Sequence, residues 1–221
     1  GNVEYIIVDG GSTDGTLDIV CKYESRIDYW LSEKDDGIYD ALNKAVSLSM
    51  GDWLYVLGSD DRLFVDALEK VSIYLKDSNT AYYGDVRLLS TGKIFDGPFS
   101  TYKMMYYNIS HQSIFYPREF CQENQYDLTY RSAADFELLM RCYGSGKFEF
   151  NYIPVLIAEY NDIVGVSSIQ EDQDFLRDRK KLVKKYFPAQ FYAAYAARYY
   201  SVRFLELIGL KHLVKQLIGG I

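Results

Sequence analysis

The stretch SEKDDGIYDALNKAVSLSMGDWLYVLGSDD, residues 32–61, decides the fold class. Tyr39, Leu42 and Val46 recur at helical spacing, so the first half predicts a helix with one apolar face. Residues 53–57, WLYVL, form an apolar run without alternation, as in strands that are buried on both faces of a parallel sheet. A helix that leads directly into a buried strand is the repeating unit of α/β proteins.

The residues before this stretch extend the same pattern. VEYIIVD at 3–9 predicts a buried strand, residues 16–23 a helix and residues 28–31 a second strand. Together with residues 32–61, the order is strand, helix, strand, helix, strand. This order indicates an α/β fold with a parallel sheet.

The residues after Asp61 alternate between further helices and strands. The expected segments are a helix at 65–76, an antiparallel hairpin across 81–97, a short strand at 111–117, a capped helix from 132 to 144 and a strand at 148–160. From Glu171 onward the pattern is helical. We therefore divide the chain into an α/β body, residues 1–168, and a helical C-terminal extension, residues 169–221.

Composition narrows the function classes. The chain has 221 residues, enough for one large domain with an appendage, and its 31 acidic and 24 basic residues give a net charge of −7. This charge argues against a nucleic-acid partner. Three widely spaced cysteines without a CxxC pair argue against structural zinc and favour a reducing compartment. The sequence has no apolar run of about 18 residues and no signal-peptide pattern, so we expect a cytoplasmic location.

Asp60 and Asp61 follow the predicted strand at 53–57 directly. In open parallel sheets, ligands bind beyond the carboxyl ends of the strands, and adjacent carboxylates are stabilised by a shared cation. Mg²⁺ or Mn²⁺ prefers such oxygen ligands and can bridge to phosphate oxygens. Alternatively, one of the two acids caps a helix that begins near Arg62. Local sequence leaves both interpretations open.

A second acid, Asp9, ends the strand at 3–9 and is followed by Gly10 and Gly11. The glycines allow a tight turn and a close approach of a ligand to the backbone. Neither a GxGxxG fingerprint nor a GK[ST] phosphate loop can be placed here. The alternative is a simple strand-to-helix turn with Ser12 or Asp14 as the cap.

The motifs become more specific when taken in order. VDGGSTDGT, DDGIYDALNKA and a strand ending in SDD, followed by HQSIFY and ADFELLMR, resemble the inverting glycosyltransferases of family 2, which have the GT-A fold. Within this family, the motifs are similar to those of bacterial enzymes that build exopolysaccharide, capsule or O-antigen. The resemblance covers roughly residues 3–168. It implies a GT-A-type, Rossmann-like mixed sheet flanked by helices, with a C-terminal helical tail.

The family has one more strand–helix unit before the VEYIIVD strand. The sequence as given lacks this unit, so the resemblance implies an N-terminally incomplete transferase domain. We expect residues 1–221 alone to be inactive or poorly folded.

The resemblance implies roles for individual acids. Asp9 matches the acid that faces the nucleoside, and Asp36 and Asn43 match residues that line the nucleotide pocket. Asp60 matches the acid near the ribose, and Asp61 the ligand of Mn²⁺ or Mg²⁺.

The chain departs from the family pattern at several positions. Gly10 stands where many relatives carry a second Asp that contacts uracil. The sequence therefore does not determine which nucleobase the donor carries. Gly58 replaces the first acid of the family's Asp-x-Asp-Asp. Residues 165–167 resemble the family's GGxS loop, with Val164 in place of its first Gly.

Asp135 matches the family's catalytic base, although Ala134 precedes it where relatives carry Glu or Asp. An inverting transfer needs one carboxylate to take the proton from the acceptor hydroxyl. Ser132 and Asp135 also form an S-x-x-D capping box, and both roles can coexist. His111 matches a position near the diphosphate or the acceptor; the alternative is a structural histidine.

The helical extension mixes aromatic and basic residues. Between 191 and 218 it carries Arg198, Arg203, Lys211 and Lys215, and a single acid. This pattern suits a membrane interface and hence a polyprenyl-linked acceptor, with residues 189–221 as the contact. The alternatives are packing against the body or against a second subunit in a homodimer.

The resemblance implies a metal-dependent, inverting transfer from a nucleotide-sugar donor, with UDP expected, to a saccharide or lipid-linked saccharide. Two other classes remain. One is a non-catalytic nucleotide- or carbohydrate-binding relative, and the other is a sugar nucleotidyltransferase, which would release pyrophosphate.

Overall fold

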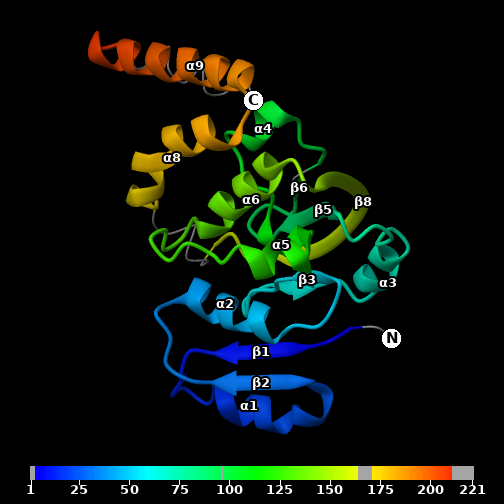
Figure 1. Ribbon diagram of the computed structural model, residues 1–221. Coiled ribbons are helices and arrows are strands. Elements are labelled where there is room, and N and C mark those ends of the chain that lie inside the picture. Colours follow the sequence, from blue (N-terminus) through cyan, green and yellow to red (C-terminus); the bar gives the residue numbers. More distant parts are fainter. Residues whose placement is uncertain (1–2, 96, 164–170, 211–221) are drawn as a thin grey trace.

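The computed structural model describes residues 3–95, 97–163 and 171–210 (Figure 1). Its strands form a two-stranded parallel sheet and a six-stranded mixed sheet. Figure 1 shows the two-stranded sheet at one end of the molecule and the last two helices at the other. Helices pack between and around the sheets, as the α/β pattern predicted.

The two-stranded sheet contains the first part of the chain. Strand β1 (Ile6–Asp9) pairs in parallel with β2 (Tyr29–Ser32), and α1 (Thr16–Lys22) and the short 3₁₀ helix η1 (Glu24–Arg26) connect them. The register places Asp9 opposite Ser32 at the carboxyl ends of both strands. The strand–helix–strand order predicted for this part of the chain is therefore confirmed.

The single parallel sheet predicted for the first three strands is wrong, because the third strand belongs to the larger sheet. Helix α2 (Ile38–Leu48) leads to β3 (Trp53–Tyr55), which pairs antiparallel with β7 (Ile114–Pro117). Among the described strands, β3 pairs with β7 and β1 pairs with β2. Local periodicity cannot reveal this, because a strand from later in the chain supplies the partner. The mixed sheet agrees with the expectation from the family resemblance.

The centre of the larger sheet consists of β5 (Thr80–Leu88) and β8 (Glu149–Tyr160), which run parallel. Strand β7 lies on the other side of β5, and the short β4 (Arg62–Leu63) pairs antiparallel with β8. Strand β6 (Ile94–Phe95) forms the predicted antiparallel hairpin with β5.

Some of the remaining helices differ from prediction only in their bounds, whereas the short ones between residues 101 and 123 lie where no helix was predicted. They are α3 (Ala67–Ser72), α4 (Thr101–Met104), η2 (His111–Ser113), α5 (Arg118–Glu123), α6 (Ala134–Ser145), α8 (Gln173–Tyr186) and α9 (Ala189–Leu207). The strand expected from residue 111 thus begins with a 3₁₀ turn. Helix α6 continues to Ser145 and ends at Gly146, whose φ of 64° is left-handed.

The larger core cluster surrounds α6. Leu138, Leu139 and Met140 are fully buried there, and α8 contributes Phe175 and Val183 to the same cluster. A second cluster fills the space between α3 and the β5–β8 pair. Helix α8 therefore packs on the body, whereas residue 168, the boundary predicted from sequence, lies outside the described residues.

Helix α9 follows α8 and extends away from both sheets (Figure 1). Its buried side chain, Tyr195, contacts the ring of Tyr106 at 5.2 Å between centroids. Across residues 3–95, 97–163 and 171–210, no helix is both long and apolar enough to cross a bilayer.

Candidate functional site

Asp61 lies between β3 and β4 and is held by two hydrogen bonds. Its Oδ1 accepts from the backbone N–H of Asn161 at 2.8 Å, and its Oδ2 accepts from Nε2 of Gln112 at 2.6 Å. The chain continues from Asp61 into strand β4 rather than into a helix. The alternative in which an acid caps a helix near Arg62 is therefore wrong.

Asp60 and Asp61 approach each other over Gly58. A Cβ at Gly58 would lie 2.6 Å from Oδ2 of Asp61 and 3.2 Å from Oδ1 of Asp60. Burial raises the pKa of Asp61, and the charge of Asp60 acts in the same direction, whereas the bonds from Asn161 and Gln112 oppose both. A cation would relieve this repulsion.

The donor chemistry of this pair fits Mg²⁺ or Mn²⁺. Both ions prefer hard oxygen ligands, and Mg²⁺ keeps several waters while binding one or two carboxylates and the phosphates of its substrate. Within the described part of the chain, no three His, Cys, Asp or Glu side chains gather into a metal cage.

Asp9 stabilises the turn after β1. Its Oδ2 accepts from the N–H groups of Gly11 and Ser12, both at 3.0 Å, and from the hydroxyl of Ser32 at 2.7 Å. The hydrogen bonds from Ser12 and Ser32 hold the pKa of Asp9 down, to about 2. Asp14, the other acid of this turn, accepts from the hydroxyl and N–H of Thr16 at the start of α1.

Asp36 and Asn43 differ in how their side chains are used. Asp36 is exposed just before α2, and its backbone N–H donates to Asp40. Asn43 uses its whole side-chain amide: Oδ1 accepts from the N–H of Tyr126 at 2.8 Å, and Nδ2 donates to the carbonyl of Tyr126 at 3.1 Å. Asn43 thus joins α2 to the segment after α5, and its role toward a nucleotide stays a prediction.

Asp135 stands in the first turn of α6, where both of its carboxylate oxygens accept hydrogen bonds. Tyr39 donates its hydroxyl to Oδ1 at 2.8 Å, and Asn108 donates Nδ2 to Oδ2 at 2.7 Å. The cap residue of α6 is Ala133, whose side chain makes no capping hydrogen bond, and the N–H of Ser132 bonds to Asp172. The capping-box interpretation of Ser132 and Asp135 is therefore wrong, and the carboxylate points toward other elements.

His111 lies next to this group. Its Nε2 is 2.9 Å from the hydroxyl of Tyr126, whose ring stacks on Tyr39 with 5.4 Å between centroids. Burial lowers the pKa of His111, while the charges of Asp135 and Asp61 act in the opposite direction. The next residue, Gln112, is the one that donates to Asp61. Adjacent residues of η2 therefore reach the surroundings of both acids.

Sequence reasoning missed the residues that hold these acids. Tyr39 lies in the quoted DDGIYDALNKA motif, but its helical spacing indicated only a core position. Nothing local to Asn108 or Asn161 indicates its bond to a distant acid. The residues that resemble a GGxS loop, 165–167, lie outside the described residues.

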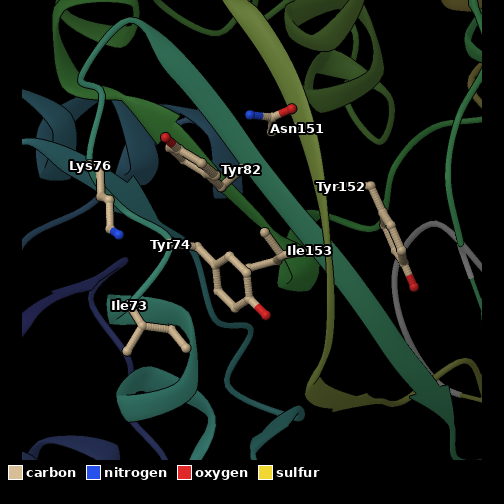
Figure 2. A pocket seen from close by; sticks show the side chains of 7 residues that line it. All are labelled: Ile73, Tyr74, Lys76, Tyr82, Asn151, Tyr152 and Ile153. Carbon is tan, nitrogen blue, oxygen red and sulfur yellow. The ribbon is translucent and has the colours of Figure 1, made fainter.

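A shallow pocket lies elsewhere, over α3, β5 and β8 (Figure 2). It is lined by Ile73, Tyr74, Lys76, Tyr82, Asn151, Tyr152 and Ile153. None of the acids described above lines it, so this pocket is separate from the candidate site.

Comparison with solved structures defines the class of protein. The fold resembles S. aureus TarS 1–349 in complex with UDP-GlcNAc, with a TM-score of 0.66, 17% identity and coverage of 83% of this chain and 57% of that one. It also resembles the mannosyltransferase PcManGT from Pyrobaculum calidifontis in complex with GDP-Man and Mn²⁺, with a TM-score of 0.57, 13% identity and coverage of 97% and 75%. The chain thus spans less than two thirds of the TarS fragment. The fold is that of the GT-A glycosyltransferases, which confirms the expectation from the sequence.

Sequence comparison gives the family. Residues 1–135 match the family model described as glycosyl transferase family 2. The PGL/p-HBAD biosynthesis glycosyltransferase of Mycobacterium tuberculosis is 37% identical over 185 residues, which are 80% of this chain and 72% of that protein. The chain belongs to glycosyl transferase family 2 and is a glycosyltransferase.

Proposed function

We propose that this protein transfers a sugar from a UDP-linked donor to a saccharide or polyprenyl-linked saccharide, with inversion at the anomeric carbon, in the synthesis of a bacterial surface polysaccharide or glycolipid. One observation carries the proposal. A single hydrogen-bonded carboxylate, Asp135, and the acid pair Asp60–Asp61 stand on separate elements, and the adjacent residues His111 and Gln112 connect their surroundings. Single-displacement transfer requires one base on the acceptor side and charge neutralisation on the leaving-group side.

Asp135 is the base in this proposal. Among the described residues, each of its oxygens accepts one donor. Because a carboxylate oxygen has two lone pairs, the described part of the chain leaves one site on each for an acceptor hydroxyl. The sugar hydroxyl gives up its proton to Asp135 as its oxygen attacks the anomeric carbon. His111 lies beside the diphosphate or the acceptor.

The donor side uses the remaining acids. Asp61, with Asp60 next to it, would hold Mn²⁺ or Mg²⁺, which neutralises charge on the leaving diphosphate when bound. Asp60 also faces the ribose, and Asp9, Asp36 and Asn43 form the nucleoside side. The names of the relatives support this assignment at the level of class: TarS was solved with UDP-GlcNAc, and PcManGT with GDP-Man and Mn²⁺.

Two measurements test this function. UDP, GDP and dTDP are titrated against the protein with Mn²⁺ and with chelator, and we expect UDP to bind in a metal-dependent way. Transfer is then compared between wild type and Asp135→Asn, which should lose turnover while it keeps donor affinity. Donor binding without turnover in the wild type would favour a non-catalytic binding relative. Release of pyrophosphate would favour a nucleotidyltransferase.

Helix α9 supports peripheral contact with the cytoplasmic face of the membrane. Tyr200, Phe204, Leu207 and Ile208 follow helical spacing, and all four are exposed, Leu207 by 84%. Arg203 lies among them and suits anionic headgroups. Co-sedimentation with anionic vesicles, with and without residues 189–221, tests this contact. Concentration-dependent dimerisation through α9 in the absence of lipid would favour the homodimer instead.

A further inference from the structure

We infer that Tyr39 and Asn108 are positioning residues that hold the Asp135 carboxylate in the orientation needed to take a proton from the acceptor. This inference rests on the proposed function, since it concerns the base of that reaction. The three residues come from α2, from the segment after α4 and from α6, so their meeting is a product of the tertiary fold.

The geometry restrains the carboxylate at both oxygens. Tyr39 donates to Oδ1 at 2.8 Å and Asn108 donates to Oδ2 at 2.7 Å, and both distances are those of well-formed hydrogen bonds. Two donors on different oxygens prevent rotation of the carboxylate about its Cβ–Cγ bond. A base held in this way presents its remaining lone pairs in fixed directions.

Tyr39 is a fixed donor. Its side chain is 8% exposed, and its ring is stacked against Tyr126, whose backbone is bonded on both sides to Asn43. Burial and the charge of Asp135 raise the pKa of the Tyr39 phenol, so its proton stays on the phenol oxygen. The direction of the hydrogen bond from Tyr39 to Asp135 is therefore constant across the neutral range.

Asn108 is fixed through helix α8. The guanidinium of Arg179 donates to the carbonyls of Met105 and Tyr106, at 3.0 Å and 2.6 Å, and lies over the ring of Phe136 at 5.2 Å. These contacts tie the segment that carries Asn108 to α8. Within the described residues, Oδ1 of Asn108 is buried without a hydrogen-bond partner. The hydrogen bond from Nδ2 to the carboxylate outweighs the cost of leaving Oδ1 unpaired, because the opposite amide orientation would place Oδ1 against Oδ2 of Asp135.

Three other polar groups influence Asp135 through their charge or burial. His111 from η2 and Tyr126 from the segment after α5 bond to each other, and Tyr116 from β7 is buried nearby. Their electrostatic effects remain when Tyr39 or Asn108 is changed. A change in the titration of Asp135 in Tyr39→Phe therefore reports on the lost donor.

The experiment compares Tyr39→Phe and Asn108→Asp with a matched control, Tyr152→Phe. Tyr152 also donates to a carboxylate, Asp85, at 2.7 Å, and neither residue bonds to Asp135 (Figure 2 labels Tyr152). Tyr39→Phe keeps the ring and removes one donor. Asn108→Asp keeps the shape and replaces a donor with a second carboxylate, which opposes ionisation of Asp135.

We expect Tyr39→Phe to lower kcat about tenfold with both KM values within about twofold of wild type. Since loss of a donor to a carboxylate raises its pKa, the acid limb of kcat/KM should move about one pH unit upward, and further in Asn108→Asp. Tyr152→Phe should change neither quantity. An acid limb at the wild-type position in Tyr39→Phe would overturn the inference. A fall in kcat with no shift of the limb would overturn it as well, because a merely structural role produces that pattern.

A second readout does not depend on turnover. The Asp135 carboxyl carbon is titrated by NMR in protein labelled with ¹³C-aspartate and assigned with Asp135→Asn. A higher pKa of Asp135 in Tyr39→Phe than in wild type supports the positioning role of Tyr39, and an equal pKa refutes it. If the full-length wild-type protein transfers no sugar from any nucleotide donor, the proposed function fails, while this titration still decides whether Tyr39 positions the Asp135 carboxylate.

Discussion

The side-chain amide of Gln112 donates a 2.6 Å hydrogen bond to Oδ2 of Asp61, across 51 positions of the chain. Gln112 is itself held, since its carbonyl accepts from the hydroxyl of Tyr55 at 3.0 Å. The residue before it, His111, bonds to Tyr126 beside the Asp135 cluster. One 3₁₀ turn therefore lies between the acid proposed for the metal and the acid proposed as the base.

Gln112→Leu should weaken metal-dependent donor binding. The substitution removes a hydrogen bond that orients Asp61, and loss of such an outer contact typically costs about 10- to 100-fold in metal affinity. Mn²⁺ titrations in the presence of UDP, followed by calorimetry, measure the effect. Tyr55→Phe is the control, because it removes the bond to the Gln112 backbone and should have a smaller effect. Equal Mn²⁺ affinity in Gln112→Leu and wild type would contradict the assignment of Asp61.

Gly58→Ala should impair the same site without unfolding the protein. Its Cβ would lie 2.6 Å from Oδ2 of Asp61 and 3.2 Å from Oδ1 of Asp60, so both carboxylates must move. A displacement of about 1 Å can cost roughly 10- to 100-fold in turnover. Steady-state kinetics with saturating Mn²⁺ measure it. The matched control is Gly51→Ala, whose Cβ would meet the Trp53 carbonyl at an ordinary 3.4 Å; if the two variants behave alike, the acid pair is not the sensitive feature.

The sequence predicted the fold class and the position of the acids more accurately than the contacts between them. Periodicity indicated β1, α1, β2 and α2 correctly, because the spacing of apolar residues within each segment is a local signal. The pairing of β3 with β7 was not predictable from periodicity. It depends on a strand whose residues lie some sixty positions later, as the register of Trp53 with Pro117 shows.

The candidate site was likewise predictable only in part: its acids were predicted from the sequence, and the residues that bond to them were not. The acids at 9, 60, 61 and 135 were found because strand ends and ordered motifs mark them. Their donors were not, because Tyr39 is 96 positions from Asp135, and Asn161 is 100 positions from Asp61. Such contacts arise only when the packed core brings α2 against the start of α6 and the end of β8 beside β4.

Asp9→Asn should destabilise the fold in a pH-dependent way. The pKa of Asp9 is lowered by folding from 3.8 to about 2, so its ionised form stabilises the native state. This contribution is fully present above about pH 4 and is lost as the pH falls through about 2. At pH 7 we expect a loss of about 1–2 kcal/mol in the free energy of unfolding, measured by urea denaturation.

The control for this prediction is Asp14→Asn, which affects an exposed acid of the same turn. It should cost less than Asp9→Asn at pH 7. The difference between wild type and Asp9→Asn should also narrow when the measurement is repeated near pH 3. A constant difference across this range would show that Asp9 stabilises the turn by its shape and not by its charge.

Gly144→Ala should destabilise the contact between the body and the C-terminal helices. Gly144 lies inside α6, and its Cβ would be 2.4 Å from the carbonyl oxygen of Tyr186 at the end of α8, a backbone atom that cannot rotate away. Separating the two helices to admit one methyl group costs about 1–3 kcal/mol. Urea denaturation of Gly144→Ala measures this loss. Ser145→Ala on the adjacent position is the control, since it removes a hydroxyl that donates to the carbonyl of Cys142 and accepts from the N–H of Lys147 but adds no atom between the helices. Because α8 carries Arg179, which fixes the Asn108 segment, kcat should fall as well. Unchanged stability and turnover in Gly144→Ala would show that α6 and α8 do not pack as closely in solution.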